Sequence, residues 1–440
     1  MGDRNTPREV ALRALIACER QGAWSDGFLK KEIGGARLDG RDAALATRLC
    51  FGVLQNRMLL DYYLGRLSTV KLEKMEPAVR NILRLGTYQV LFLDRVPDHA
   101  AVSQSVEQAR AHSRNPRSAG LVNGILRSLT RQKGELRQPE ELSVRYSHPQ
   151  WLVDTFARRL PKDELEALLA ADNGEPPTCI QVNTCKTDTH SLVDTLSEEG
   201  MKVHPHPWLP DCLLLESTGN LEQSAAFQRG LFYVQDAAAK LAVLAADPKP
   251  DMAVLDACAA PGGKSFAAAI AMEGRGSITS CDIHPHKMEL IQAGARRLGF
   301  DCISAEVLDG KACKADFLDK FDLVIADVPC SGLGIIRKKP DIRYKDPKPL
   351  EGLPRVQTAI LDNVARYVKP GGTLLYATCT LLERENEAVV ISFCEKHSDF
   401  TLEAFQLPQP FGMCSSGMVT CWPHRHGTDG FFFARLRRAL

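Results

Sequence analysis

The sequence predicts a multidomain protein in which an all-α bundle is followed by a small α+β module and then by an α/β domain with a parallel sheet. Three observations predict this order. Apolar residues recur at helical spacing up to about residue 131, a polar stretch follows at 131–141, and strand-like apolar runs alternate with helical patterns from about residue 250. We therefore place the domains at residues 1–135, 145–245 and 246–440.

The bundle is predicted to begin with a capped helix. Thr6-Pro7-Arg8-Glu9 forms a capping box with proline at the first helical position. A last helix is expected over 117–129, and Gly134 and Pro139 then indicate a linker. A further apolar stripe between these two helices consists of Val79, Ile82, Leu83, Gly86, Val90 and Leu93. Such stripes most simply form the core of a helical bundle.

The two remaining domains are predicted from strand-like runs. In the middle module, strands are expected at 179–183 and 213–216, with a helix at 191–199 between them. A helix over 354–368 is expected to stop before Pro370-Gly371-Gly372. The strands of the C-terminal domain are expected at 252–257, 277–282, 302–306, 321–327 and 373–378.

Composition narrows the class of protein. The chain has 440 residues, a net charge of +1 and 14 cysteines, and no two cysteines form a Cys-x-x-Cys pair. No apolar run is long enough to span a membrane, so we expect a cytoplasmic protein with reduced cysteines and no membrane contact. Cys414, Cys421, His424 and His426 match no common zinc spacing, and no metal is expected.

A cofactor loop is predicted after the first strand of the α/β domain. Residues 251–264 read as a strand, a tight turn with Gly262 and Gly263, and the start of a helix. The loop fits neither the dinucleotide fingerprint nor a P-loop. Asp282 ends the second strand, where an acid can accept hydrogen bonds from a ribose diol, and Asp309 follows the third. S-adenosylmethionine suits this arrangement, and a purely structural turn is the alternative.

Two cysteines are expected at the same edge of the sheet. Cys330 follows the strand at 321–327, and Cys379 follows the strand at 373–378. Ligands bind outside the carboxyl ends of the strands in such sheets, so two thiols there suggest covalent chemistry beside a methyl donor. A thiolate that adds to carbon 6 of cytosine makes carbon 5 nucleophilic. The chemistry alone leaves open which cysteine attacks.

Two further side chains are placed to help this reaction. Asp327 lies three residues before Cys330 and is expected to act as the acid near N3 of the base, which makes carbon 6 electrophilic. Lys264, at the helix start, is expected to lower a thiol pKa or to orient the base. Local basic patches are candidates for nucleic-acid contact, namely Arg337, Lys338, Lys339, Arg343 and Lys345, and Arg435, Arg437 and Arg438.

The combined motifs resemble the RNA (cytosine-C5) methyltransferases. The resemblance rests on Asp256-Ala-Cys-Ala-Ala-Pro-Gly-Gly-Lys264, Asp327-Val-Pro-Cys330-Ser-Gly, Arg337-Lys-Lys-Pro-Asp341, Ala377-Thr-Cys379, Glu385-Asn386-Glu387 and Asp429-Gly-Phe-Phe432. The helical domain resembles the NusB-like domain of the bacterial Sun/Fmu branch, through Arg84-Leu-Gly-Thr-Tyr-Gln89 and Leu121-Val-Asn-Gly-Ile-Leu-Arg127. Tyr146-Ser-His-Pro149 and Val182-Asn183 resemble its RRM-like middle module.

The resemblance implies a Rossmann-like catalytic domain and a division of roles. Cys379 resembles the nucleophile and Cys330 the residue that assists product release, whereas DNA cytosine methyltransferases attack with the Pro-Cys cysteine. The branch implies one cytosine of 16S ribosomal RNA, naked or partly assembled, as substrate. The implied contacts of S-adenosylmethionine are Cys258, Ala259, Ala260, Pro261, Gly262, Gly263, Lys264, Asp282, Asp309 and Asp327. Two rivals are a non-catalytic NusB-like RNA-binding or antitermination factor and a DNA cytosine-C5 methyltransferase.

Overall fold

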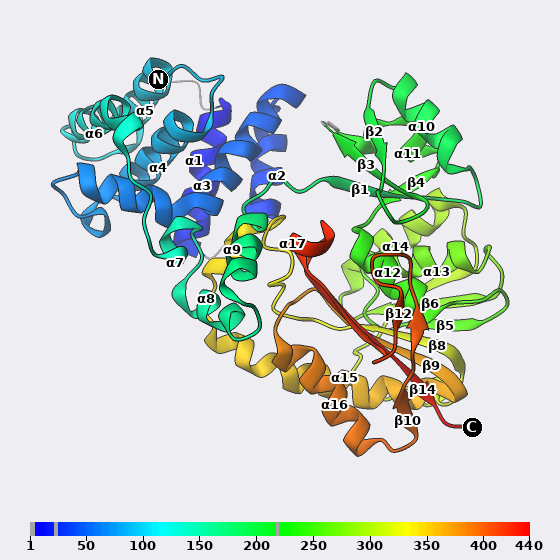
Figure 1. The fold of residues 1–440 in the computed structure, drawn as a ribbon. Helices are drawn as coiled ribbons and strands as arrows, with labels where there is room; N and C mark the ends of the chain where they lie inside the picture. The colour runs from blue at the N-terminus through cyan, green and yellow to red at the C-terminus, as the bar shows by residue number, and fades with distance from the viewer. Residues whose placement is uncertain (1–4, 22–24, 217–219) are drawn as a thin grey trace. The chain divides into compact units, whose positions relative to one another are not determined.

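A computed structural model describes residues 5–21, 25–216 and 220–440 (Figure 1). The chain divides into two compact units. The first runs to Glu175 and also includes Ile336–Lys345, and the second consists of Pro176–Ile335 and Asp346–Leu440. Within the described ranges, no helix is both long enough and apolar enough to cross a membrane.

The first unit is helical. Thr6 caps its first helix, because the Thr6 hydroxyl accepts a hydrogen bond from the Glu9 N–H at 3.3 Å. The α-helices of this unit are α1 (Pro7–Gln21), α2 (Ser25–Ala36), α3 (Gly40–Leu67), α4 (Pro77–Phe92), α5 (Asp98–His112), α6 (Ser118–Gln132), α7 (Leu142–Arg145), α8 (Gln150–Ala157) and α9 (Lys162–Ala171). Single-turn 3₁₀ helices are η1 (Leu72–Lys74), η2 (Lys133–Glu135) and η5 (Pro340–Tyr344).

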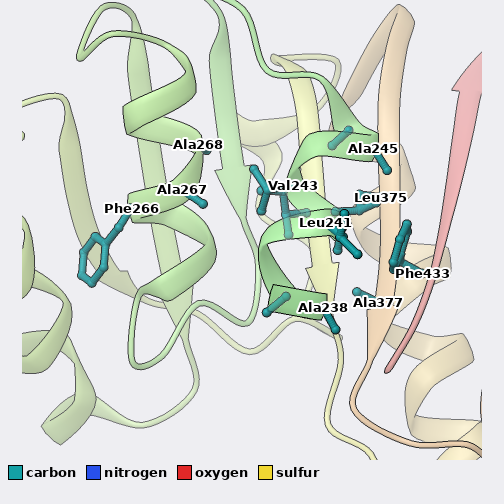
Figure 2. Packing of buried hydrophobic residues seen from close by; sticks show 14 of the residues in the cluster. Ala238, Leu241, Val243, Ala245, Phe266, Ala267, Ala268, Leu375, Ala377 and Phe433 are labelled. Atoms are coloured by element: carbon teal, nitrogen blue, oxygen red, sulfur yellow. The ribbon is translucent and has the colours of Figure 1, made fainter. Parts of the chain in front are cut away.

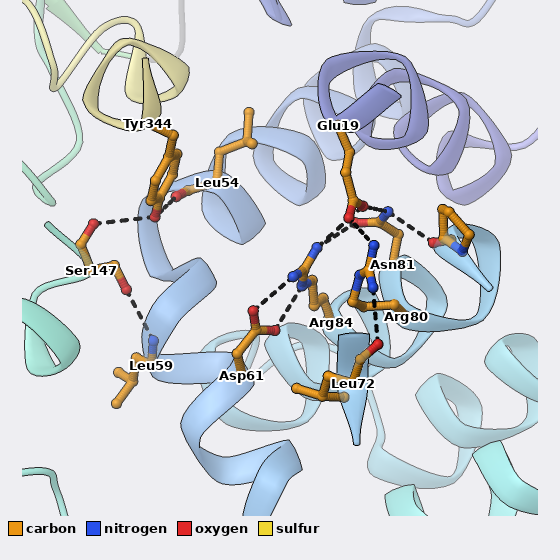
Figure 3. A network of polar contacts seen from close by, with 11 residues as sticks. Glu19, Leu54, Leu59, Asp61, Leu72, Arg80, Asn81, Arg84, Ser147 and Tyr344 are labelled. Atoms are coloured by element: carbon orange, nitrogen blue, oxygen red, sulfur yellow. Dashed lines mark hydrogen bonds and ion pairs between the residues drawn. The ribbon is translucent and has the colours of Figure 1, made fainter. Parts of the chain in front are cut away.

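The predicted stripe on α4 is the core of this bundle. Val79, Ile82 and Leu83 are buried in one cluster with residues of α1, α3, α5 and α6. A polar network holds the other side of α4 (Figure 3): Arg84 makes two hydrogen bonds of 2.7 Å to Asp61 on α3, and Arg80 pairs with Glu19 on α1. The bundle is therefore joined by apolar burial and by a network of paired charges.

The second unit begins with a four-stranded antiparallel sheet in the order β2-β3-β1-β4. Helices α10 and α11 cover one face, where Ile180, Val182 and Phe232 are buried. The opposite face, with Cys179, Cys212 and Tyr233, belongs to the same core as α12 and α13. The elements are β1 (Thr178–Val182), α10 (Thr189–Glu198), β2 (Lys202–Pro205), β3 (Cys212–Glu216), η3 (Leu221–Gln223), α11 (Ala225–Gln228), β4 (Phe232–Val234) and α12 (Ala237–Ala246).

A second, eight-stranded sheet carries the candidate site. Its order is β10-β14-β9-β8-β5-β6-β7, with β13 paired to β14, and the strands from β9 to β7 are parallel. The strands are β5 (Ala253–Asp256), β6 (Ser277–Asp282), β7 (Ile303–Val307), β8 (Phe321–Asp327), β9 (Val368–Thr378), β10 (Phe400–Leu402), β13 (Met418–Cys421) and β14 (Phe431–Arg438), and the separate pair is β11 (Phe405–Gln406) and β12 (Met413–Cys414). The helices are α13 (Gly263–Ala271), α14 (Pro285–Leu298), η4 (Ala315–Phe317), η6 (Lys348–Gly352), α15 (Leu353–Val364), η7 (Ala365–Tyr367), η8 (Glu383–Glu385), α16 (Glu387–Lys396) and α17 (Pro423–His426).

Helices cover both faces of the large sheet. Figure 2 shows α12 between the α13 alanines Ala267 and Ala268 on one side and Leu375, Ala377 and Phe433 of β9 and β14 on the other. Leu374 and Tyr376, which alternate with these residues on β9, pack instead in a core with α15 and α16. This two-sided burial explains the near-continuous apolar runs that predict the strands.

The five predicted strands of the large sheet are present, with one clear difference. The helix expected over 354–368 ends at Val364, and β9 already begins at Val368, so Pro370-Gly371-Gly372 lies inside a strand. A register shift between Phe321 and Leu323 interrupts the β8–β9 ladder beside these residues and accommodates them. Strands β2 and β4 were not predicted, because four-residue and three-residue strands carry little pattern.

Candidate active site

The predicted cofactor loop joins β5 to α13 and is shaped by two glycines. Gly262 has a φ of 110° in the left-handed region, which favours glycine. A Cβ atom on Gly263 would lie 2.9 Å from the Gln235 side-chain nitrogen. The loop is therefore packed closely against neighbouring side chains, and it leads directly into the start of α13.

The acids predicted to bind the donor follow adjacent strands. Asp282 ends β6, and its carboxylate accepts a hydrogen bond from the His284 N–H at 3.0 Å. Asp309 lies beyond the end of β7, and its side chain accepts from the Lys311 N–H at 3.0 Å. Both loops lie near Cys258. The negative charge of Asp282 helps to raise the pKa of the Cys258 thiol, and a Cβ atom on Gly310, next to Asp309, would lie 3.9 Å from the Cys258 sulfur.

Lys264, at the end of the predicted cofactor loop, is buried and forms an ion pair with the partly exposed Asp327. The Lys264 ammonium donates to the Asp327 carboxylate at 2.5 Å, and Lys264 is only 8% exposed. Burial disfavours the charged amine, but the Asp327 carboxylate outweighs burial and raises the pKa of Lys264 above its ordinary value. Lys264 therefore stays an ammonium at neutral pH, and the Cys379 thiolate also favours that charge.

The two cysteines meet at the edge of the sheet. Strands β8 and β9 are parallel neighbours in which Asp327 pairs with Ala377, so the chain brings Cys330 and Cys379 together. Their sulfur atoms lie 3.2 Å apart, and both residues are half-buried free thiols. Contact with Cys379, together with burial, raises the pKa of the Cys330 thiol. The two thiols are therefore in hydrogen-bonding contact, and either sulfur can be the donor.

Asp256 is a site residue whose role was missed from sequence. Its side chain is fully buried at the end of β5, accepts from the Ser265 hydroxyl at 2.7 Å, and Ser265 accepts from Ser280 at 2.8 Å. Among the described residues, its second oxygen, Oδ1, has no hydrogen-bond partner. Burial raises the pKa of Asp256 to about 7. The sequence signal was a carboxylate on the last residue of a buried strand.

Glu385 and Asn386 are two more residues that the sequence marked only as part of a motif. Both are fully buried. The Glu385 carboxylate accepts from the Ser331 N–H at 2.9 Å, and the Asn386 amide bonds to the residues on either side of Cys379. Charged side chains are rarely fully buried unless they are paired. The sequence does not show which side chains are buried, so it could not identify these two residues as parts of the site.

The structure corrects the basic patches. Arg343 belongs to the first unit and is fully buried there, where it donates to Asn173 Oδ1 at 2.7 Å and to the Gln55 carbonyl at 3.2 Å. Tyr344 next to it lies 2.8 Å from the Leu54 carbonyl (Figure 3). Arg343 is therefore wrong as an RNA contact, whereas Lys338, Lys339 and Lys345 keep partly exposed side chains.

The C-terminal arginines are engaged in ion pairs. Arg435 and Arg437 both pair with Glu403, at 2.6 and 3.0 Å, and Arg438 pairs with Asp399 at 3.1 Å. These charges are balanced within the second unit and do not form a free basic patch. In the small sheet, Tyr233 lies on the face that packs against α12 and α13 and is only 3% exposed.

No metal centre emerges in the part of the chain that the structure describes, because no group of three or more His, Cys, Asp or Glu side chains is arranged to hold an ion. Cys421 is fully buried, and Cys414 lies in the same apolar core. His426 accepts from the Trp422 N–H at 2.8 Å, which gives this histidine a local structural role.

Comparison with known proteins identifies the family. Family models match three segments, described as 16S rRNA methyltransferase RsmB/F (243–437), NusB family (5–131) and the RsmF/B-like ferredoxin-like domain (148–222). A probable ribosomal RNA small subunit methyltransferase B of Bacillus subtilis is 38% identical over 99% of this chain and 99% of its own length. The chain belongs to the RsmB/F family of 16S rRNA methyltransferases. A probable ribosomal RNA small subunit methyltransferase B of Synechocystis is 34% identical over 98% of this chain and 99% of its own length.

A solved structure gives the same result for the fold. The crystal structure of PH0851 matches with a TM-score of 0.80 and 26% identity, over 98% of this chain and 99% of that one. The family resemblance and the predicted fold class are thereby confirmed: a NusB domain, a ferredoxin-like module and a Rossmann-like methyltransferase domain. The boundaries placed at 1–135, 145–245 and 246–440 stay a prediction, and we note that α8 and α9 cluster with the helical unit.

Proposed function

We propose that this protein transfers a methyl group from S-adenosylmethionine to carbon 5 of one cytosine in 16S ribosomal RNA, through a covalent bond between Cys379 and carbon 6. The observation that carries the proposal is the pair of sulfur atoms 3.2 Å apart, at the strand ends that also present the Lys264–Asp327 pair. Membership of an rRNA methyltransferase family supports the reaction class. Methylation at carbon 5 is proposed from the chemistry of a thiolate that adds to carbon 6, and cytosine is proposed from the resemblance of the motifs to the RNA (cytosine-C5) methyltransferases.

The residues present fit S-adenosylmethionine. The turn at Gly262 and Gly263 leads into α13, and Asp282 and Asp309 stand at the ends of the next two strands. The unpartnered Oδ1 of buried Asp256 offers one more acceptor at the end of β5. We infer that the loop 258–264 would hold the amino-acid tail and that Asp282 would bind the ribose diol. When bound, the cofactor supplies the methyl group.

The chain's own residues would perform the remaining steps. The Cys379 thiolate forms a bond to carbon 6 while N3 takes up a proton from water. The Asp327 carboxylate would accept a hydrogen bond from that N3–H, so that carbon 5 becomes nucleophilic. After carbon 5 has received the methyl group, a base removes its proton, the sulfur–carbon 6 bond breaks, and the ring double bond returns. Cys330 assists this elimination and releases the RNA. The positive charge of the Lys264 ammonium would stabilise negative charge on the Cys379 sulfur.

The RNA is proposed to be naked or partly assembled. Enzymes that modify a base draw it out of its stack into a pocket, which a finished and compact subunit would resist. Methyl transfer to naked 16S ribosomal RNA should therefore be faster than transfer to assembled small subunits, and we expect the enzyme to act in the cytoplasm. Equal rates on both substrates would count against this part of the proposal.

Replacing each cysteine singly tests the proposal. With radiolabelled donor and 16S ribosomal RNA, Cys379→Ala should lower methyl transfer by at least about 10³-fold, since the nucleophile is lost. Near-normal turnover of Cys379→Ala would refute the assignment. Calorimetric titration with S-adenosylmethionine separates the enzyme from a non-catalytic RNA-binding factor, which should take up none. Competition between duplex DNA and ribosomal RNA separates it from a DNA methyltransferase.

A further inference from the structure

Two consecutive buried side chains hold the chain on both sides of both cysteines. Glu385 and Asn386 follow β9 by a few residues, at the end of η8, and neither is exposed to solvent. The Tyr376 hydroxyl fixes their backbone by donating to the Glu385 carbonyl at 2.5 Å. Burying a carboxylate is costly unless hydrogen bonds compensate for it, so the bonds that these residues make define what they do.

Asn386 bridges the two neighbours of Cys379. Its side-chain oxygen accepts from the Thr378 hydroxyl at 2.6 Å, and its amide nitrogen donates to the Thr380 carbonyl at 2.9 Å. Cys379 lies between these two threonines in the sequence. The bridge therefore fixes the backbone that carries the Cys379 sulfur.

Glu385 does the same for Cys330 with the help of one other residue. Its Oε2 atom accepts from the Ser331 N–H and from the Gln357 amide, both at 2.9 Å. The Gln357 amide nitrogen also donates to the Pro329 carbonyl at 3.1 Å. Both neighbours of Cys330 are thus bound to the same carboxylate, directly or through Gln357.

We propose that Glu385 and Asn386 are positioning residues that divide the two thiols between them. Asn386 positions Cys379 for attack on carbon 6, and Glu385 positions Cys330 for release of the methylated RNA. This inference rests on the proposed function and adds the groups that set its geometry. The hydroxyls of Ser331 and Thr380 join the two loops at 2.7 Å, but Asn386 bonds beside Cys379 and Glu385 beside Cys330. Loss of one clamp should therefore affect one half of the reaction more than the other.

The Asn386 arm is tested on the attack step. RNA that contains 5-fluorocytosine retains the covalent adduct, because fluorine cannot leave carbon 5 as a proton does, and a denaturing gel then measures the rate of attack. We expect Asn386→Ala and Thr378→Val to slow adduct formation about tenfold or more, since misplaced reacting atoms are expensive. Thr378→Ser keeps the hydroxyl and should restore most of the rate.

The Glu385 arm is tested on the release step with ordinary RNA. Glu385→Ala should accumulate a denaturant-resistant protein–RNA adduct, while the rate of trapping by 5-fluorocytosine RNA stays within about twofold of wild type. Glu385→Gln should largely abolish the accumulation, because one amide oxygen can accept both bonds that now reach Oε2. Thermal unfolding of each variant identifies those that have lost their fold.

The outcomes are distinguishable from failure of the proposed function. If wild type forms no adduct with 5-fluorocytosine RNA, the covalent mechanism itself is wrong. If wild type forms it and the folded Glu385 and Asn386 variants slow attack and release equally, or change neither, the division of positioning between these residues is overturned. Accumulation with Glu385→Ala and slow trapping with Asn386→Ala, each corrected by its conservative variant, supports it.

Discussion

The Cys330–Cys379 pair and the Cys179–Cys212 pair have the same sulfur–sulfur distance, 3.2 Å, in two parts of the second unit. Cys179 and Cys212 lie on neighbouring antiparallel strands of the small sheet and are 5% and 1% exposed, under α12 and α13. Cys330 and Cys379 follow two parallel strands and are half-buried. The same sulfur–sulfur distance therefore occurs in two different structural surroundings.

The charges around the two pairs differ as well. Lys264, beside the first pair, is bound to the Asp327 carboxylate and keeps a raised pKa. Lys240, beside the second, donates to the carbonyls of Pro210 and Asp211 at 2.8 and 3.1 Å, and burial lowers its pKa. Of the two pairs, only Cys330–Cys379 combines partial solvent exposure with a neighbouring carboxylate and a glycine-rich loop. The comparison teaches that placement at strand ends, rather than thiol proximity, marks the candidate active site.

We expect the largest difference when each of the two lysines is replaced, in a separate variant, by an uncharged side chain. Lys264→Met should lower methyl transfer by about 10³-fold, within the range for loss of a group that assists proton transfer and charge. Lys240→Met, the matched control, should stay within about twofold, because its bonds are to carbonyls of the small module. The measurement is initial rate with labelled donor. A similar loss in both variants would break the comparison.

A smaller but more specific effect is expected from the second thiol of each pair. Cys330→Ala should accumulate a covalent protein–RNA adduct and lower turnover by about a hundredfold, since release becomes slow. Cys212→Ala should form no excess of adduct. Gel electrophoresis under denaturing conditions distinguishes the two. The absence of a shifted band for Cys330→Ala would remove its role in release.

The smallest effect concerns stability against pH, and its sign is opposite for the two pairs. Cys330 has a raised pKa in the folded protein, so its contribution is full below the unfolded thiol value of about 8.5 and is lost as pH rises through the folded pKa. Hydrogen bonding from Cys179 lowers the pKa of Cys212, so its contribution is full above about pH 8.5 and is lost as pH falls.

Urea unfolding of Cys330→Ala and Cys212→Ala between pH 6 and pH 10 measures this difference. Relative to wild type, the free energy of unfolding of Cys330→Ala should rise above pH 8.5, by about 1.4 kcal/mol for each pH unit below the folded pKa of Cys330. The free energy of unfolding of Cys212→Ala should fall relative to that of wild type as the pH rises from 6 to 8.5. Parallel curves for both variants would show that the environments of the two pairs are alike.

The sequence alone predicts that Cys330 and Cys379 meet, but it does not predict that Cys179 and Cys212 do. Parallel strands end at one edge, so two apolar runs that each end in cysteine predict a meeting of Cys330 and Cys379. The meeting of Cys179 and Cys212 depends on an antiparallel register, and the second pair's surroundings depend on the three-residue strand β4 and on the packing of α12. Neither register nor such packing is written in a local pattern.

Long-range partners explain the other differences. Arg343 stands in a run of basic residues that indicates a solvated face, yet its partners Gln55 and Asn173 lie far away in the sequence. Glu385 was recognised only as part of a motif, because its bonds to Ser331 and Gln357 join separate loops. Local patterns predicted the elements and the catalytic edge, whereas the groups that hold this edge in place required the tertiary structure.

The most direct test of the account is to identify the cysteine that bonds to the base. The complex of wild-type protein with 5-fluorocytosine 16S ribosomal RNA would be digested with protease and nuclease, and tandem mass spectrometry would locate the modified residue. The account predicts a nucleotide attached to Cys379 and an unmodified Cys330. A nucleotide attached to Cys330, with Cys379 free, would contradict it.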